Sequence, residues 1–156
     1  MEKILIIDDE QVVVDTLTLA LEGMRFEVIS TTDPVEGMHI FAEHEPFLIL
    51  LDINMGTMNG LDFIDHLIQN ELPKHRLTNT ISPGDVMRDG NSQTLKQADF
   101  FVVVLTGYGD KQLMQNCRAL GVEYFLNKPI HLLTLRNTLD KLHQLKLSRD
   151  SLKEVL

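Results

Sequence analysis

Cysteine, positive charge and long apolar runs are all scarce in this sequence, and each shortage excludes a class of protein. A single cysteine, Cys117, rules out an internal disulfide and fits a reducing compartment. The 23 acidic residues outnumber the 14 lysines and arginines, so the formal net charge of −9 disfavours binding to a nucleic-acid backbone. No apolar run reaches the roughly 20 residues of a membrane span, and the apolar stretch at the N-terminus is too short for a signal peptide. We therefore expect a cytoplasmic protein that contacts neither nucleic acid nor membrane directly.

The remaining composition is ordinary for one globular domain. With 156 residues, 44% of them apolar and 24% charged, the chain is long enough to bury a core. The six histidines are scattered, and no pair has the spacing of metal ligands along one helix face. No histidine is therefore proposed as a metal ligand.

Short apolar runs alternate with helical patterns along the chain. Strands are predicted at 3–7, 25–29, 47–51, 100–105 and 124–126, and helices at 12–21, 33–44, 61–68, 111–120 and from 129 onward. Asp33 is expected to cap the second helix, with Pro34 in its first turn. Strands that alternate with helices form right-handed βαβ units, and hence a parallel sheet covered on both faces. The sequence therefore predicts an α/β fold, a flavodoxin-like, doubly wound (βα)5 domain with strand order 2-1-3-4-5.

One long stretch, from about residue 70 to residue 99, fits neither pattern. It contains Pro, Gly, Asn and Ser in turn-forming combinations, with only isolated apolar residues between them. We interpret it as a long insertion between the third helix and the fourth strand. Because it connects a helix end to a strand start, it should lie at the pole opposite the carboxyl ends of the strands.

The domain is expected to span residues 1–147, and residues 148–156 would extend the last helix or begin a linker. Leucines at 142, 145, 152 and 156 continue the apolar stripe of that helix almost to the end of the chain. Such a stripe suits a linker or a dimer contact. We therefore favour the interpretation that the chain is a part excised from a longer protein.

Five polar side chains stand at the ends of the predicted strands. Asp8 and Asp9 follow the first strand, Asp52 follows the third, Thr106 the fourth and Lys128 the fifth. In a doubly wound sheet the carboxyl ends of the strands meet at one edge, where functional residues gather. We therefore expect these five side chains to form one site.

Three carboxylates crowded together repel one another unless a cation is present. Oxygen ligands with an open, watery shell favour Mg²⁺ or Mn²⁺. A carboxylate can also act as a nucleophile toward a phosphoryl group and form an aspartyl phosphate. The metal, one lysine and one hydroxyl would neutralise the oxygens of the transferred group, so the set is suited to phosphoryl transfer.

At these positions the sequence resembles the receiver domains of two-component response regulators. The matching motifs are Asp8-Asp9, LLDINM around Asp52, Met58-Asn59-Gly60, LTGYGD from Leu105 to Asp110, and GVEYFLNKP from Gly121 to Pro129. The resemblance extends from residue 3 to about residue 145, apart from the insertion. Each motif alone is weak, but together they are highly specific.

The resemblance implies a phosphoacceptor and a metal site. Asp52 would accept the phosphoryl group, and Asp9, Asp52 and the backbone carbonyl of Asn54 would bind Mg²⁺ (or Mn²⁺). Asp8 would contact the metal through water. Asn54 and its neighbours lie in the loop that follows the third strand.

The resemblance also implies a switch. Lys128 would hold the phosphoryl group, Thr106 would be the switch hydroxyl and Phe125 the switch aromatic residue. The peptide bond between Lys128 and Pro129 would be cis, which only X-Pro bonds adopt at low cost. Gly56 departs from the pattern, because the family often has proline there, and it suggests a more mobile loop.

These roles predict a phosphorylation switch rather than an enzyme, with at most slow autodephosphorylation. A sensor histidine kinase or a phosphotransfer protein would donate the phosphoryl group. The surface formed by the fourth helix, the fifth strand and the last helix would then change and bind a downstream effector domain or protein. A homodimer through the last helix is compatible with this function.

Two alternatives remain at this point. A haloacid-dehalogenase-like phosphatase also uses an aspartyl phosphate and Mg²⁺, but it needs a second acid two residues after the nucleophile. Position 54 is asparagine, which cannot shuttle a proton, and the acidic pair precedes Asp52 instead of following it. The second alternative is a docking module of the same fold without phosphotransfer, which the complete set of site residues argues against.

Overall fold

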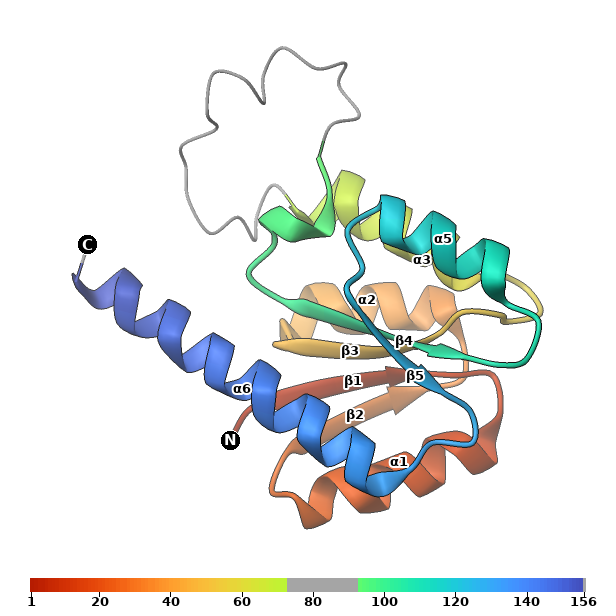
Figure 1. Ribbon diagram of the computed structural model, residues 1–156, viewed down its shortest axis with the longest axis horizontal. Coiled ribbons are helices and arrows are strands. Elements are labelled where there is room, and N and C mark those ends of the chain that lie inside the picture. The colour runs from red at the N-terminus through yellow and green to blue at the C-terminus, as the bar shows by residue number, and fades with distance from the viewer. Residues whose placement is uncertain (73–92, 156) are drawn as a thin grey trace.

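The computed structural model describes residues 1–72 and 93–155, and its centre is a parallel sheet. The sheet has five strands in the order β2-β1-β3-β4-β5, as the sequence predicts, and every neighbouring pair is parallel (Figure 1). The strands are β1 (Lys3–Ile7), β2 (Glu27–Thr31), β3 (Leu48–Asp52), β4 (Phe101–Thr106) and β5 (Tyr124–Asn127). The predicted α/β fold is confirmed.

Helices cover both faces of the sheet. They are α1 (Gln11–Gly23), α2 (Pro34–His44), α3 (Gly60–His66), α5 (Lys111–Ala119) and α6 (Leu132–Val155). Figure 1 shows α1 and α6 on one face and α2, α3 and α5 on the other. No helix in the described part of the chain combines the length and the apolarity that crossing a membrane requires.

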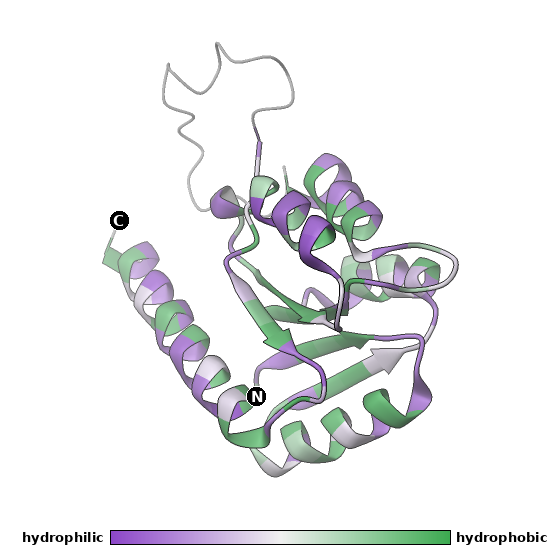
Figure 2. Ribbon diagram, turned by 45° about the vertical axis from the view of Figure 1, so that its right-hand side comes forward, coloured by the Kyte–Doolittle hydropathy of each residue, from purple (hydrophilic) through white to green (hydrophobic). Residues whose placement is uncertain are grey.

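Each face of the sheet carries its own apolar core, because successive side chains of a strand point to opposite faces. In β1, Leu5 and Ile7 pack on the side of α2, α3 and α5, whereas Ile4 and Ile6 pack on the side of α1 and α6. Figure 2 shows apolar residues along the length of the strands. Burial on both faces explains why the central strands β1, β3 and β4 are nearly unbroken apolar runs in the sequence.

The second helix begins as predicted. The Asp33 carboxylate accepts a hydrogen bond from the N–H of Val35 at 2.9 Å, and Pro34 occupies the first turn of α2. The helix α3 begins in the same way, since the Asn59 side chain accepts from the N–H of Asp62 at 2.8 Å. These caps fix where the chain turns away from the loops that follow β2 and β3.

The second strand lies two residues later than predicted. Arg25 has a φ of 69°, a left-handed conformation that closes the turn after α1 and cannot belong to a strand. The pairing with β1 therefore begins at Glu27, opposite Lys3. The predicted helix at 61–68 also changes, because α3 ends at His66 and continues as a π-helical turn, η1 (Leu67–Glu71).

The end of the predicted insertion is folded against the domain. A short 3-10 helix, η3 (Leu95–Gln97), precedes β4, and the N–H of Leu95 donates to the carbonyl of Leu120 at 2.9 Å. Gly121 has a φ of 100°, and a Cβ there would lie 2.8 Å from the nitrogen of Leu95, so only glycine fits. This described flank lies at the amino ends of β4 and β5, opposite the site, as expected. The rest of the insertion, residues 73–92, lies outside the described residues.

The last helix continues without a break through the predicted boundary at residue 147. Leu135, Leu139 and Leu142 are buried, but Leu145 and Leu152 are exposed, so the apolar stripe belongs to the core only in its first half. Other contacts hold the second half.

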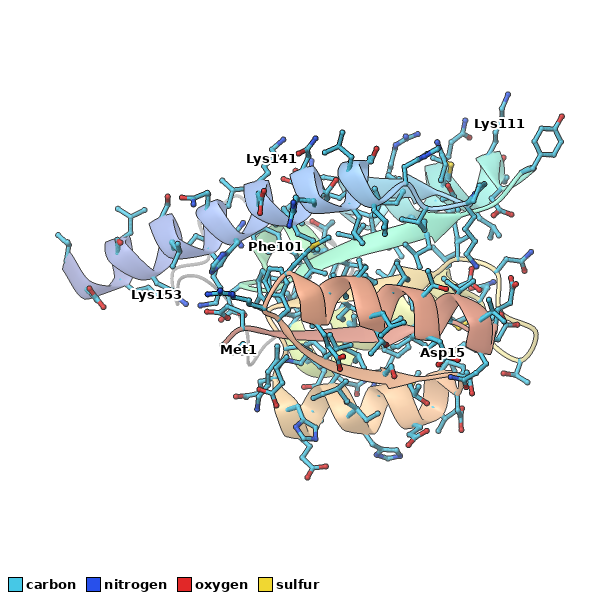
Figure 3. The ribbon with its side chains drawn as sticks, turned by 90° about the horizontal axis from the view of Figure 1, so that it is seen from below. Met1, Asp15, Phe101, Lys111, Lys141 and Lys153 are labelled. Atoms are coloured by element: carbon cyan, nitrogen blue, oxygen red, sulfur yellow. The ribbon has the colours of Figure 1, made fainter. Side chains whose placement is uncertain are left out.

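Arg149 anchors the second half of α6 by placing its guanidinium 4.4 Å from the centre of the Phe101 ring. Lys153 pairs with Asp99 at 3.7 Å, and Lys146 pairs with Glu2 at 3.2 Å. Figure 3 shows Lys153 on the side of Met1, at the amino ends of the strands, whereas Lys111 lies at the opposite end.

Candidate functional site

The carboxyl ends of β1, β3 and β5 bring an ammonium group between two carboxylates. Lys128 places its Nζ 2.8 Å from an oxygen of Asp8 and 3.3 Å from an oxygen of Asp52. Asp8 is fully buried and Asp52 is 3% exposed. The carboxyl ends of these strands lie at one edge of the sheet (Figure 1), and Asp8, Asp52 and Lys128, three of the five residues expected to meet, contact one another there.

An acidic cluster lies beside this contact. Asp8, Asp9 and Glu10 each offer one carboxylate oxygen, and these three oxygens lie within 4.8 Å of one another. Glu10 also lies 3.6 Å from the Nζ of Lys128. Asp9 and Glu10 are exposed, so the cluster opens to solvent on one side. Sequence reasoning missed Glu10, although its position directly after the acidic pair was a usable signal.

The loop after β3 folds back onto the acidic residues. The N–H of Gly56 donates to Asp9 at 3.3 Å, and the N–H of Asn54 donates to Asp52 at 3.3 Å. Asn54 itself is exposed in this loop. Gly60 allows the loop to close, because a Cβ there would lie 2.9 Å from the carbonyl oxygen of Asp52.

Thr106 ends β4 with its hydroxyl directed toward β5. The residue is 1% exposed, and its Oγ1 donates to the side-chain oxygen of Asn127 at 2.9 Å. The carbonyl of Leu126, 3.4 Å from the same Oγ1, is a second and more distant acceptor. The carbonyl of Thr106 accepts from the N–H of Lys128 at 2.7 Å. Asn127 is a second residue that sequence reasoning missed, although it directly precedes Lys128 in the motif GVEYFLNKP.

Phe125 lies on β5 and is partly buried. Its ring packs against the core on the side of α2, α3 and α5, and the guanidinium of Arg118 lies 4.8 Å from the ring centre. The peptide bond between Lys128 and Pro129 is cis, as the resemblance implies.

The surroundings of Asp52 oppose its ionisation. Burial and the neighbouring charge of Asp8 raise the pKa of Asp52 from 3.8 to about 7, and Lys128 and the N–H of Asn54 offset only part of this shift. Burial lowers the pKa of the Lys128 ammonium, but hydrogen bonding to Asp8 and the charges of Asp52 and Asp8 outweigh burial and raise it. The site therefore holds more carboxylates than its lysine can neutralise, which is the donor set and the charge balance that suit a hard divalent cation.

The comparisons with known proteins identify the class. A family model described as the response regulator receiver domain matches residues 4–86, which is more than half of the chain. The chain therefore belongs to the family of response regulator receiver domains.

Individual relatives agree with this assignment. A probable chemotaxis protein CheY of Rhizobium etli is 30% identical over 128 residues, which cover 81% of each chain. An uncharacterized response regulatory protein of Staphylococcus epidermidis is 26% identical over 152 residues, which cover 96% of this chain and 49% of that protein. The chain thus spans about half the length of that longer relative.

Solved structures show the same fold. The chemotaxis protein CheY4 of Vibrio cholerae is 22% identical and superposes with a TM-score of 0.68, covering 91% of this chain and 98% of that one. The comparisons do not favour the haloacid-dehalogenase-like phosphatase.

Proposed function

We propose that this domain is the phosphoacceptor of a two-component system and that Asp52 receives the phosphoryl group. A sensor histidine kinase or a phosphotransfer protein would be the donor, in the cytoplasm. The observation that supports the proposal most strongly is the contact of Lys128 with both Asp8 and Asp52 at the carboxyl edge of the sheet.

The transfer requires an ionised Asp52. One of its oxygens attacks the phosphorus atom, the bond from phosphorus to the donor's leaving atom breaks, and the electron pair of that bond leaves with the donor. The product is a mixed anhydride between the Asp52 carboxyl and phosphate. Lys128, already 3.3 Å from Asp52, is placed to neutralise the phosphoryl oxygens as they approach.

Magnesium or manganese fits the residues on this edge. Asp9, Asp52 and the backbone carbonyl of Asn54 would hold the ion, and Asp8 would contact it through water. When bound, the ion supplies positive charge to the phosphoryl oxygens and relieves the repulsion among the carboxylates. Glu10, within the same acidic cluster, adds to the negative potential that attracts the cation.

The output would be a change of surface. Thr106 would turn its hydroxyl to the phosphoryl group, Phe125 would follow, and the face formed by α5, β5 and α6 would present a different surface to a downstream effector. The exposed leucines at 145, 147 and 152 on α6 also support a homodimer or a helical connection through this element. On this account the domain is a switch, and any hydrolysis of its own phosphoryl group is slow.

Replacement of Asp52 by asparagine tests the proposal. The wild-type chain, incubated with acetyl phosphate and Mg²⁺, should gain the mass of one phosphoryl group in an acid-labile form. Asp52→Asn should lose essentially all of this label, because an amide is not a nucleophile toward phosphorus at neutral pH. Asp62→Asn, an exposed acid on α3, is the matched control and should label like wild type. Full labelling of Asp52→Asn would refute the assignment.

A further inference from the structure

We infer that Asn127 is a positioning residue that holds the hydroxyl of Thr106 toward β5, and thereby sets how readily Thr106 turns to a phosphoryl group on Asp52. The inference rests on the proposed function of Asp52. It assigns a role to Asn127, which takes no part in the proposed phosphoryl transfer or metal binding.

The two side chains meet across neighbouring strands. Thr106 and Asn127 are register partners in the pairing of β4 with β5, and their side chains are joined by the 2.9 Å hydrogen bond. Thr106 is buried, whereas Asn127 is exposed at the rim of the site. The side chain that holds the Thr106 hydroxyl is exposed, so Asn127 can be substituted without disturbing the core.

The hydroxyl has one proton and can donate it to only one acceptor at a time. A phosphoryl oxygen on Asp52 requires that same proton, so the bond to Asn127 must break before Thr106 can serve the site. Thr106 turns its hydroxyl from Asn127 to the phosphoryl group in an equilibrium. A single hydrogen bond that is partly exposed to competing water lowers the constant of that equilibrium by about two- to fivefold.

The backbone keeps Lys128 independent of this bond. Asn127 directly precedes Lys128, but the N–H of Lys128 is held by the carbonyl of Thr106 and its Nζ by Asp8 and Asp52. Removal of the Asn127 amide therefore leaves the hydroxyl of Thr106 only the longer contact with the Leu126 carbonyl at 3.4 Å, while the ammonium stays in the site.

The test is a titration of the full chain with beryllofluoride, a phosphoryl analogue, in excess Mg²⁺, followed by NMR. Asn127→Ala should bind beryllofluoride about two- to fivefold more tightly than wild type, because the acceptor that remains for Thr106, the Leu126 carbonyl at 3.4 Å, holds the hydroxyl more weakly than Asn127 does. Before any ligand is added, the Thr106 resonances of this variant should shift, and Asn127→Asp, which keeps an acceptor oxygen, should restore them. Asn70→Ala, an exposed asparagine on η1, is the matched control and should leave the affinity unchanged.

A double-mutant cycle separates positioning from a general structural effect. In a Thr106→Ala background the gain from Asn127→Ala should disappear, because the group that Asn127 holds is gone. An equal gain in both backgrounds, or an affinity of Asn127→Ala equal to that of wild type, would overturn the role of Asn127. If wild type itself bound beryllofluoride no better than Asp52→Asn, the proposed function would fail, and this inference with it.

Discussion

Asp52 is buried, and its carboxyl group is costly to ionise when no cation is bound. Its pKa is raised to about 7, first by burial and then by Asp8, although Lys128 lies close. An unfolded chain would release the same proton near pH 3.8. Between these two values the folded state retains a proton that the unfolded state has lost.

The contribution of Asp52 to the stability of the protein should therefore fall as pH rises from about 4 to about 7, because at Asp52 the unfolded state binds fewer protons than the folded state over this range. Asp52→Asn removes the effect and should be more stable than wild type at pH 8 by about 1–3 kcal/mol, with a smaller difference at pH 4. Urea unfolding at both pH values, without divalent cations, measures the difference. A difference that does not change with pH would contradict the account.

At the residue scale, the sequence predicted Asp8, Asp52 and Lys128 as members of one site but did not single out Glu10 or Asn127. Asp8, Asp52 and Lys128 could be placed because the carboxyl ends of parallel strands meet at one edge. Glu10 could have been included, because it directly follows the acidic pair, whereas the contact of Asn127 with Thr106 depends on side-chain conformations that no spacing in the sequence encodes. The hydroxyl of Thr106 was expected in the site, whereas the structure directs it to Asn127 on β5.

At the scale of elements, the loop between β3 and α3 depends on a close backbone approach that only glycine allows at position 60. A Cβ at Gly60 would lie 2.9 Å from both the carbonyl oxygen of Asp52 and the Cα of Ile53, which are backbone atoms that cannot move independently. The loop carries Asn54 and Gly56, whose N–H groups bond to Asp52 and Asp9. A substitution at position 60 should therefore shift the loop and displace the N–H groups that bond to Asp52 and Asp9.

Gly60→Ala should destabilise the protein by about 1–3 kcal/mol and slow the phosphorylation of Asp52, because the loop must shift to accept the methyl group. Thermal unfolding and the rate of labelling by acetyl phosphate measure the two effects. The control is Gly23→Ala, since a Cβ at Gly23 would meet nothing within 4 Å. Equal behaviour of the two variants would show that the close approach at Gly60 has no consequence.

The second half of α6 depends on contacts that its leucines do not make. Arg149 lies over the buried ring of Phe101 at the start of β4, and a partly desolvated cation–π contact of this kind contributes about 1–2 kcal/mol. Arg149→Ala should therefore lower the unfolding free energy by about that amount, whereas Arg136→Ala, an exposed arginine in the first half of α6, should change it less. Urea denaturation distinguishes the two. No loss in Arg149→Ala would mean that the second half of the helix is held in another way.

Element boundaries were the least predictable feature of the fold. The left-handed Arg25 displaced the second strand, and α3 continued as a π-helical turn where one helix was expected. The leucine stripe predicted that the last helix continues almost to the end of the chain, but the anchors of its second half are charged and aromatic groups of distant segments. The Asp33 cap made the start of α2 predictable, whereas the left-handed turn at Arg25 and the anchors of α6 leave no pattern in the sequence.

At the scale of the whole molecule, the two ends of the sheet carry different features. The acidic site lies at the carboxyl ends of the strands, whereas the flank of the insertion at η3 and the anchored end of α6 lie at the amino ends (Figures 1 and 3). Strand order was predictable because right-handed crossovers leave few ways to arrange five βα units. The excess of acidic over basic residues is in keeping with a site that attracts a cation.

The most direct test of the account is to locate the phosphoryl group on the chain. Treatment with acetyl phosphate and Mg²⁺, followed by borohydride reduction of the acyl phosphate and peptide mass spectrometry, converts the phosphorylated aspartate to an alcohol and marks its position. The account predicts that the reduced residue is Asp52 and that omission of the divalent cation abolishes the mark. Reduction at Asp8, Asp9 or any other acid in place of Asp52, or equal marking without the cation, would contradict it.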